Sequence, residues 1–202
     1  MKSNPNSFGD AQLWDLIATG DRDAFAFIFK NYSKNLVNYG HKFTTESDLI
    51  EDVIQDTFVH LWESRERLVI QKSIKFYLFS CFRRELIKRL KTNPKNESLE
   101  EYHANMSWQE SFQEILVENQ ITLESHQKIT RAIETLSVRQ KEAIFLRYIQ
   151  ELSYEEISQL MGIQVPSLYN LIFKGIKTMK DFLSSSHFTA KTVALIWTFS
   201  QY

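Results

Sequence analysis

Glycine, proline and cysteine are scarce in this sequence. Its 202 residues include only 5 Gly and 3 Pro, which leaves few turn signals and favours long helices over many short strands. The single cysteine, Cys81, can form no internal disulfide. It lies in the apolar run YLFSCF, where we expect a small buried side chain rather than a reactive thiol. Without a second cysteine or a histidine cluster, we expect no metal site.

Long apolar runs are also missing. The most apolar part of the tail, residues 193–199, is far shorter than the roughly 20 residues that a membrane-spanning helix requires. The N-terminal stretch MKSNPNSFGDAQLWD is too polar for a secretory signal. We therefore expect a cytoplasmic protein. Its 43% hydrophobic and 13% aromatic residues are sufficient for buried cores.

The formal net charge of −1 hides an uneven distribution along the chain. Residues 1–91 carry 14 Lys and Arg against 12 Asp and Glu, and residues 127–202 carry 9 against 6. Residues 92–126 carry one Lys against seven Glu. An acidic middle thus separates two mildly basic ends. Nucleic acids respond to local charge, so the neutral total does not exclude DNA binding.

Helical periodicity dominates the first ninety residues. In residues 10–32, apolar side chains recur at steps of three and four: Leu13, Leu16, Ile17, Phe25, Ile28, Phe29 and Tyr32. Gly20 and Asp21 interrupt the pattern, and we expect them to end one helix and cap the next. A helix over 48–63 would bury Ile50, Val53, Ile54, Phe58, Leu61 and Trp62. A fourth helix, basic at its end, is predicted to start after Ser73.

Turn-forming residues and weak periodicity mark the acidic stretch, which we interpret as a linker over 92–122. The predicted fold is therefore all-α, with one helical domain at 8–91 and a second at 123–183. The tail, 184–202, is either a small amphipathic segment that packs on a domain or contacts a regulator, or a frayed end.

Residues 152–180 have the layout of a helix-turn-helix. Ser153 and Glu156 form a capping-box pattern that fixes a helix start, and Gly162 supplies a left-handed cap. Pro166 falls in the first turn of the next helix, where its missing N–H leaves no bond unsatisfied. An inward stripe is predicted from Leu168, Ile172, Gly175 and Met179, with Gly175 allowing close approach of a neighbouring helix.

The outward positions of this second helix are polar first and basic later. They are Ser167, Tyr169, Asn170, Phe173, Lys174, Lys177 and Lys180. A recognition helix contacts bases with its N-terminal part and phosphates with other positions, and this order fits that division. An ordinary helical hairpin with solvated lysines is the alternative.

A basic and aromatic segment precedes the linker. Residues 72–91 hold seven Lys and Arg against the single Glu85, with Phe76, Tyr77, Phe79 and Phe82 between them. Basic side chains follow a phosphate backbone, and aromatic rings stack on unpaired bases. Helical spacing also suits a core, so we expect most of the four rings to be buried, with Tyr77 the most exposed.

One face of the predicted helix at 48–63 is acidic, with Glu51, Asp52, Gln55, Asp56 and Glu63. Carboxylates repel phosphate, so this face cannot bind DNA. No metal-ligand or nucleophile pattern accompanies them, which argues against a catalytic pair. It is either a docking surface for a basic protein partner or a solvated face.

Taken in order, these pieces resemble bacterial RNA polymerase sigma factors. The segments GDRDAFAFIFKNY, DLIEDVIQDTFVHLWE and LSVRQKEAIFLRYIQELSYEEISQLMGI are similar to the small two-domain extracytoplasmic-function (ECF) group over about 10–91 and 123–183. The ending NLIFKGIKTMK resembles the branch found in Bacteroidetes. The resemblance implies a region 2-like domain, a region 4-like domain and an acidic linker that threads the polymerase interior.

The resemblance also implies roles for the faces described above. Docking on the clamp of core polymerase would involve Asp52, Gln55, Asp56 and Trp62, with Trp62 a core anchor. The loop around 66–72 and the following helix would capture a flipped base of the minus-ten element, using Lys72, Lys75, Tyr77, Arg83, Arg84 and Lys88. The minus-thirty-five element would be bound by Gln164, Pro166, Ser167, Tyr169, Asn170, Lys174 and Lys177.

Partners implied by the resemblance are core RNA polymerase (its clamp and flap regions), promoter DNA and an anti-sigma factor that could hide the binding faces. Several residues depart from the family's habit: Gln164 stands in place of Ser or Asn, and Tyr169 in place of a basic residue. Arg84 and Lys88 likewise replace the usual Asn and Asp. These departures bear on the promoter sequence rather than on the function.

A stand-alone helix-turn-helix regulator that binds duplex DNA as a dimer is the alternative function. Such a protein needs neither an acidic docking helix nor a basic aromatic segment for single strands. We expect neither catalysis nor a cofactor, because the sequence has no phosphate-binding loop, metal cluster or nucleophile elbow.

Overall fold

The computed structural model describes residues 9–70, 73–92 and 123–184. All regular structure within them is helical, which confirms the predicted all-α fold with two helical domains. The chain divides into two compact units, Met1–Met106 and Ser107–Tyr202. The predicted linker (92–122) and tail (184–202) lie outside the described residues except for Thr92 and Ser184, each of which is the last residue of a helix. Lys72 is also outside the described residues. The exact domain boundaries stay predictions.

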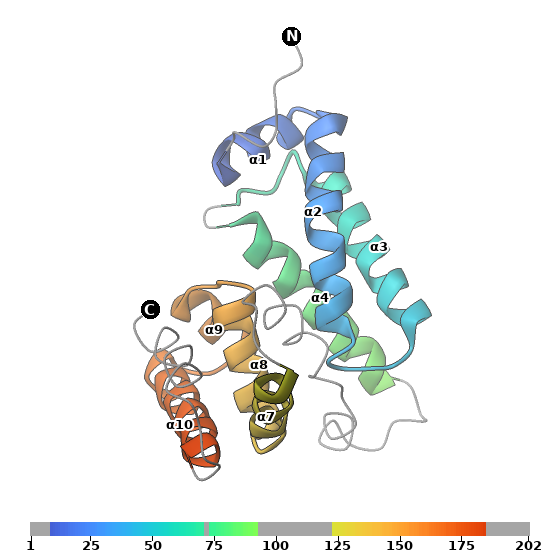
Figure 1. The fold of residues 1–202 in the computed structure, drawn as a ribbon. Coiled ribbons are helices and arrows are strands. Elements are labelled where there is room, and N and C mark those ends of the chain that lie inside the picture. The colour runs from blue at the N-terminus through green and yellow to red at the C-terminus, as the bar shows by residue number, and fades with distance from the viewer. Residues whose placement is uncertain (1–8, 71–72, 93–122, 185–202) are drawn as a thin grey trace. The chain divides into compact units, whose positions relative to one another are not determined.

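The first unit consists of α1 (Asp10–Ala18), α2 (Arg22–Gly40), α3 (Ser47–Ser64) and α4 (Ile74–Thr92). α2 and α3 run side by side, and α4 packs against both, while α1 lies on α2 (Figure 1). Their core holds many of the side chains in the predicted apolar patterns, although Leu16, Phe25 and Tyr32 are only partly buried. The buried side chains include Leu13, Ile17, Ile28, Leu36, Ile50, Val53, Ile54, Phe58, Leu61, Leu78, Phe79, Phe82 and Leu86.

The predicted break between the first two helices is confirmed. Gly20 takes a left-handed conformation with φ of 89°. The Asp21 carboxylate then accepts a hydrogen bond from the backbone N–H of Ala24 and caps α2. Two residues thus end one helix and begin the next, which is why the apolar stripe changes direction here.

The start of α4 is fixed from two sides. Ser73 Oγ accepts a hydrogen bond from the Phe76 N–H at 3.0 Å. Asp10 Oδ2, from the first residue of α1, accepts one from the Ile74 N–H at 2.9 Å. Both bonds satisfy N–H groups that a helix start leaves free, and a carboxylate there also suits the helix dipole. The N-terminal helix therefore helps to set where α4 begins.

Gly40, the last residue of α2, marks a close approach of three helices. A Cβ atom at this position would lie 2.8 Å from Cγ2 of Ile50 and 2.9 Å from Cζ of Phe82. Ile50 belongs to α3 and Phe82 to α4, and both side chains are fully buried. Only glycine lets the end of α2 pack so close to both neighbours.

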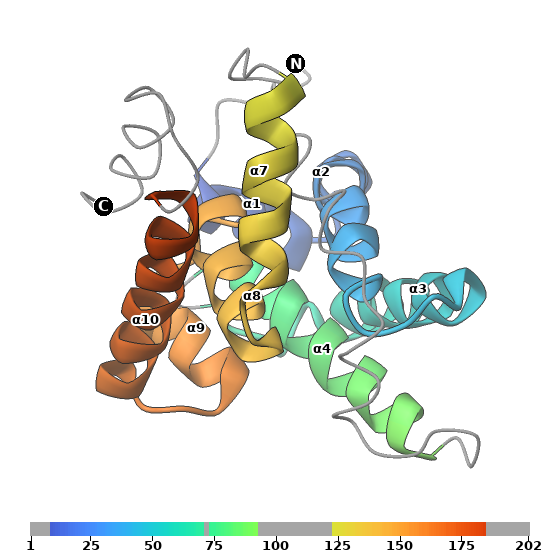
Figure 2. The same ribbon diagram turned by 60° about the horizontal axis from the view of Figure 1, so that its bottom comes forward.

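The second unit contains α7 (Leu123–Glu134), α8 (Val138–Ile144), the π-helix η2 (Phe145–Ile149), α9 (Tyr154–Met161) and α10 (Val165–Ser184). α10 packs along α7 and α8 and closes against α9 (Figure 2). Its inward stripe is as predicted, since Leu168, Ile172, Gly175 and Met179 are all buried. A Cβ on Gly175 would lie 3.0 Å from Cδ1 of Ile144, so this glycine does sit at a close helix contact.

The helix-turn-helix corner is confirmed in its details. Ser153 and Glu156 form the capping box of α9, with both hydrogen bonds present. Gly162 ends α9 in the left-handed conformation, with φ of 66°. Ser158 Oγ then donates a hydrogen bond to the Ile163 carbonyl at 2.6 Å, which ties the turn to α9. Pro166 follows in the first turn of α10, where no N–H is required.

Candidate functional site

The acidic side of α3 is exposed along most of its length. Asp52, Gln55 and Asp56 are all exposed, as are Glu51 and Glu63. Asp52 forms no ion pair within the described residues. Asp56, by contrast, pairs with Arg89 of α4. This face therefore combines a free carboxylate with one that is tied to the neighbouring helix.

Arg89 lies between two carboxylates. Besides Asp56, it binds Glu85 one turn earlier on α4, with its Nε 3.1 Å from Glu85 Oε1. The hydrogen bond from Arg89 holds the pKa of the Glu85 carboxyl below its usual value, with a smaller contribution from Lys88. Among the described residues, Arg89 is thus bound by two carboxylates and is 30% exposed, whereas Lys88 forms an ion pair with Glu85 alone, at 3.3 Å, and is 69% exposed. We therefore count Lys88 but not Arg89 among the cations available to DNA.

Trp62 is only half-buried, so the prediction of a fully buried side chain was wrong. Its ring meets Phe25 edge-on with ring centroids 5.0 Å apart. The guanidinium of Arg65 covers it at 4.5 Å from the ring centroid. Trp62 thus anchors α3 to α2 while keeping part of its ring at the surface.

An apolar groove lies between α2 and α3, which we call the α2/α3 groove. It has a volume of about 460 Å³ and is lined by Arg22, Phe25, Phe29, Gln55, Phe58, Val59, Trp62 and Glu63. Phe29 and Val59 are each 45% exposed. Phe29 was predicted to join the buried stripe, but it sits at the groove edge against Phe58, with ring centroids 4.8 Å apart. Exposed apolar side chains beside carboxylates are typical of a protein-binding surface.

The basic side of α4 presents its cations unevenly. Arg84 and Lys88 are exposed, and Lys75 and Arg83 are partly exposed. Phe79 and Phe82 are fully buried, so two of the four aromatic rings are buried rather than most of them. Tyr77, which was predicted to be the most exposed of the four rings, is half-buried, as is Phe76, and its hydroxyl is fully buried. Burial raises the pKa of Tyr77 well above its ordinary value. Because the residue is half-buried, only part of its ring can face a ligand.

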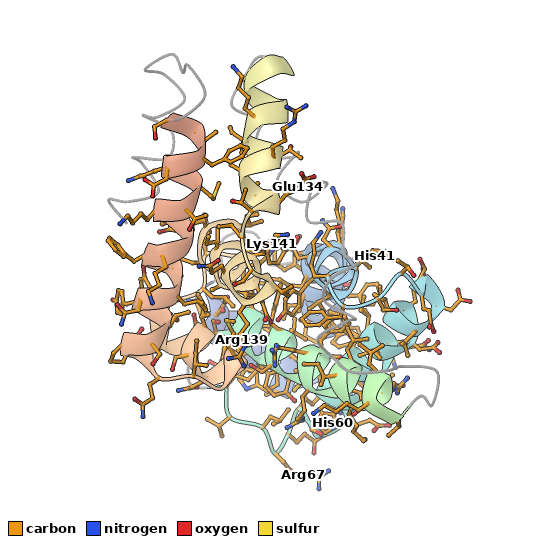
Figure 3. The ribbon with its side chains drawn as sticks, turned by 90° about the horizontal axis from the view of Figure 1, so that it is seen from below. His41, His60, Arg67, Glu134, Arg139 and Lys141 are labelled. Atoms are coloured by element: carbon orange, nitrogen blue, oxygen red, sulfur yellow. The ribbon has the colours of Figure 1, made fainter. Side chains whose placement is uncertain are left out.

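The loop after α3 carries a cation that the sequence analysis left out. Arg67 is exposed, and Figure 3 shows its side chain pointing away from the helices. Glu66 next to it is held by Arg65 at 3.1 Å. The loop therefore places an exposed positive charge between α3 and α4.

The outward face of α10 is exposed where it was predicted to be. Its exposed side chains are Gln164, Pro166, Ser167, Tyr169, Asn170, Phe173, Lys174 and Lys177. Lys180 is only half-exposed. Tyr169 is not free in space, because its ring stacks on that of Tyr154 at 3.9 Å between centroids. Tyr154 was not predicted to belong to this surface, and only the fold brings it there from the start of α9.

Within the described residues, no cluster of three or more His, Cys, Asp or Glu side chains could hold a metal ion. The same residues include no helix long and apolar enough to cross a membrane.

Comparisons with known proteins account for both units. The model of Sigma-70 region 2 matches residues 28–95, and that of Sigma-70 region 4 matches residues 126–179. Together the two matches cover more than half of the chain. The chain belongs to the sigma-70 family. Its two domains are thus a sigma region 2 and a sigma region 4.

Curated relatives specify the group. The chain is 22% identical over 170 residues to the ECF RNA polymerase sigma factor SigW of Bacillus subtilis, which covers 81% of this chain and 91% of the relative. It is 23% identical over 178 residues to the ECF RNA polymerase sigma-E factor of Haemophilus influenzae. That match covers 85% of this chain and 94% of the relative. This sigma factor is thus of the ECF type and directs transcription initiation by RNA polymerase from promoter DNA. The stand-alone dimeric regulator is not favoured.

Solved structures show the same fold. The structure of CnrH in complex with the cytosolic domain of CnrY matches with a TM-score of 0.56 and 18% identity, covering 88% of this chain and 99% of CnrH. The sigma factor RpoE from Bartonella quintana matches with a TM-score of 0.51 and 18% identity, covering 81% and 98%. Sigma factors are in general not enzymes, in line with surfaces built for binding.

Proposed function

We propose that this sigma factor binds core RNA polymerase through the outward side of α3 and the adjoining α2/α3 groove. Asp52, Gln55 and Asp56 would meet basic side chains on the polymerase clamp, with Trp62 anchoring the helix that carries them. The observation that carries this proposal is an exposed Asp52, which forms no ion pair within the described residues, together with the exposed apolar side chains of Phe29 and Val59. Apolar contacts supply affinity, and charges supply orientation and rate.

The minus-ten element would be bound by the loop after α3 and by α4. Exposed Arg84 and Lys88 would contact phosphates, with Lys72, Lys75 and Arg83 beside them. The exposed part of the Tyr77 ring would stack on an unpaired base, and Arg67 adds a charge to the loop. The minus-thirty-five element would be bound by α10. The exposed polar residues near the start of the helix would contact bases, and the lysines further along would contact phosphates.

The acidic linker, 92–122, would occupy the polymerase interior between these two domains, at 8–91 and 123–183. We propose that the protein works in the cytoplasm, where core polymerase is found, and has no catalysis of its own. The NLIFKGIKTMK ending of α10 supports the Bacteroidetes branch of the group.

An anti-sigma factor is a further proposed partner. RpoE of Bartonella quintana, whose fold this chain shares, was solved with the anti-sigma factor NepR. The exposed apolar side chains of the α2/α3 groove are a surface that such a protein could cover in the absence of core polymerase.

Binding to purified bacterial core polymerase, followed by run-off transcription, tests the proposed function. We expect the full chain to bind core and to start transcripts at defined promoters. If the chain binds duplex DNA alone yet neither binds core nor directs initiation, the proposal fails in favour of the stand-alone regulator.

Two substitutions on α10 separate base contacts from phosphate contacts. Lys174→Ala should weaken binding to all promoter sequences alike and lower the slope of log affinity against log salt by about 1. Asn170→Ala should instead change base preference, reducing discrimination at one position by roughly 5- to 100-fold. Holoenzyme binding to promoter variants at several salt concentrations measures both. Identical behaviour of the two variants would contradict the assignment.

A further inference from the structure

Three side chains form a layered stack beside the recognition helix α10. The Tyr154 ring contacts both of the others. The Tyr169 ring is nearly parallel to it, with centroids 3.9 Å apart and an angle of 18° between the planes. The guanidinium of Arg147 also lies 4.9 Å from the Tyr154 ring centroid. The stack joins the π-helix η2, the first residue of α9 and the second turn of α10.

Tyr154 is held from several directions. The capping box of Ser153 fixes the start of α9, and hence the backbone of Tyr154. Arg147 is itself anchored, because its Nη1 donates a hydrogen bond to the Leu152 carbonyl at 3.0 Å. Burial first, and then the charge of Tyr154 together with a hydrogen bond to it, raise the pKa of Tyr148 to about 12. The capping box and the anchored Arg147 thus hold Tyr154 in place.

The π-helix contributes to this support. Arg147 and Tyr148 are consecutive residues of η2, and both contact Tyr154. A π-turn holds one more residue than an α-turn, which changes the direction of the side chains that it carries, and such turns are frequent at functional sites. The local backbone thus places two polar side chains around one ring.

Stacking restricts Tyr169, whose ring would otherwise be free to change rotamer on the surface. The side chain is 50% exposed although one face lies on Tyr154. Phe173, one turn further along α10, is 68% exposed. Residues four apart share a helix face, so the two rings form an apolar strip on the outward side of the helix. A ring already held in place loses less entropy on binding than a mobile one.

An apolar strip on a major-groove helix has one chemical match on the base edges. Donors and acceptors mark all four bases there, but only thymine presents a methyl group. Phosphate oxygens take positive charge, which in this helix begins at Lys174, or a hydroxyl donor, which Tyr169 has but the Phe173 ring beside it lacks. The face that the two rings share is apolar. The chemistry of Tyr169 therefore fits a thymine C5-methyl group rather than the DNA backbone.

We propose that Tyr169 contacts the methyl group of a thymine in the minus-thirty-five element, and that Tyr154 is the positioning residue that holds Tyr169 for this contact. This inference rests on the proposed role of α10 in binding that element. Beyond that role, it assigns a base (thymine), a chemical group (its C5-methyl) and a positioning residue outside α10 (Tyr154).

The test uses holoenzyme assembled from the full chain and core polymerase. Promoter duplexes are first selected from a library randomised over the minus-thirty-five element, and each thymine of the selected element is then replaced by deoxyuridine. For the natural chain, we expect one replacement to weaken binding about fourfold, the effect of one buried methyl group. Tyr169→Ala should bind both duplexes equally. Tyr154→Ala should lose most of the difference, and Tyr154→Phe, which keeps the ring, should retain it.

Three results would overturn the proposal: a selected element without thymine, a natural chain indifferent to every deoxyuridine, or a Tyr154→Ala variant with the full fourfold difference. If Tyr154→Ala does not fold by circular dichroism, Tyr154→Leu replaces it, since leucine keeps apolar volume but has no ring face. Failure of the proposed function is distinguishable, because the natural holoenzyme would then not form or not select any promoter.

Discussion

Replacing Asp52 with arginine is expected to lower the affinity for core RNA polymerase by about 30-fold or more, the effect of removing one well-desolvated charge pair at an interface. Asp52 is exposed on α3 and has no ion-pair partner within the described residues. Its carboxylate is therefore available to a basic partner in the complex. The substitution removes the attraction between this carboxylate and a basic side chain of the polymerase. It also places a second positive charge next to that basic side chain.

Asp52 gives a cleaner test than Asp56 does. Asp56 pairs with Arg89, which also binds Glu85. Arginine at position 56 would face Arg89 and disturb the packing of α4 on α3, so a loss of binding could come from the fold. Asp52→Arg changes the same charge without breaking a described contact.

Asp15→Arg is the matched control. Asp15 is an exposed carboxylate on α1 in the same unit, and its reversal changes the net charge by the same amount. Affinity for core polymerase, measured by fluorescence anisotropy, should fall for Asp52→Arg and stay within about twofold for Asp15→Arg, because exposed charges far from an interface contribute little. Equal losses in the two variants would mean that total charge, not the α3 surface, governs binding.

Replacing Gly40 with alanine is expected to destabilise the first unit by about 1–3 kcal/mol, the usual effect of overpacking. The added methyl would lie within 3.0 Å of both Ile50 and Phe82, two buried side chains on different helices. Neither can withdraw without disturbing the core. The melting temperature should fall by roughly 5–20 °C, following the usual ratio for small domains.

Gly175→Ala is the control that separates the effect of a steric clash from the effect of replacing a helical glycine. Its Cβ would meet Ile144 at Cδ1, the far end of a flexible side chain, at 3.0 Å. The mild crowding is offset by a gain in helix propensity of up to about 1 kcal/mol. Calorimetry of the full chain should show a lowered transition for Gly40→Ala and a nearly unchanged one for Gly175→Ala. A Gly40→Ala variant as stable as the natural chain would show that the helices can separate at low cost.

Local patterns predicted much of the fold. Asp21 as a cap, Gly162 as a left-handed end and the stripe from Leu168 to Met179 depend on residues at most a few turns apart. Helix periodicity and capping act over that range, so the sequence carries them directly. The exposed face of α10 follows from the same stripe, as its opposite side.

Features that depend on contacts between helices were not predictable in the same way. Asp56 and Arg89 lie 33 residues apart, so their pairing depends on how α3 crosses α4. Phe29 fits the apolar period of α2 but lies where two helices leave a groove. Tyr154 meets Tyr169 only because the turn at Gly162 folds α10 back beside α9. Periodicity identifies a helix face but does not tell how completely a neighbour covers it.

The hydrogen bond from the Ile74 N–H to Asp10 bears on where a fragment that contains the whole first domain should begin. The region 2 match starts at residue 28, which leaves out all of α1. Yet α1 buries Leu13, Trp14 and Ile17, and its Asp10 caps the helix that carries the basic residues of the minus-ten surface. A fragment cut at the match boundary would lose that cap and expose apolar surface on α2. The segment that matches the family model therefore begins later than the segment that packs as one unit. The packed unit includes Asp10.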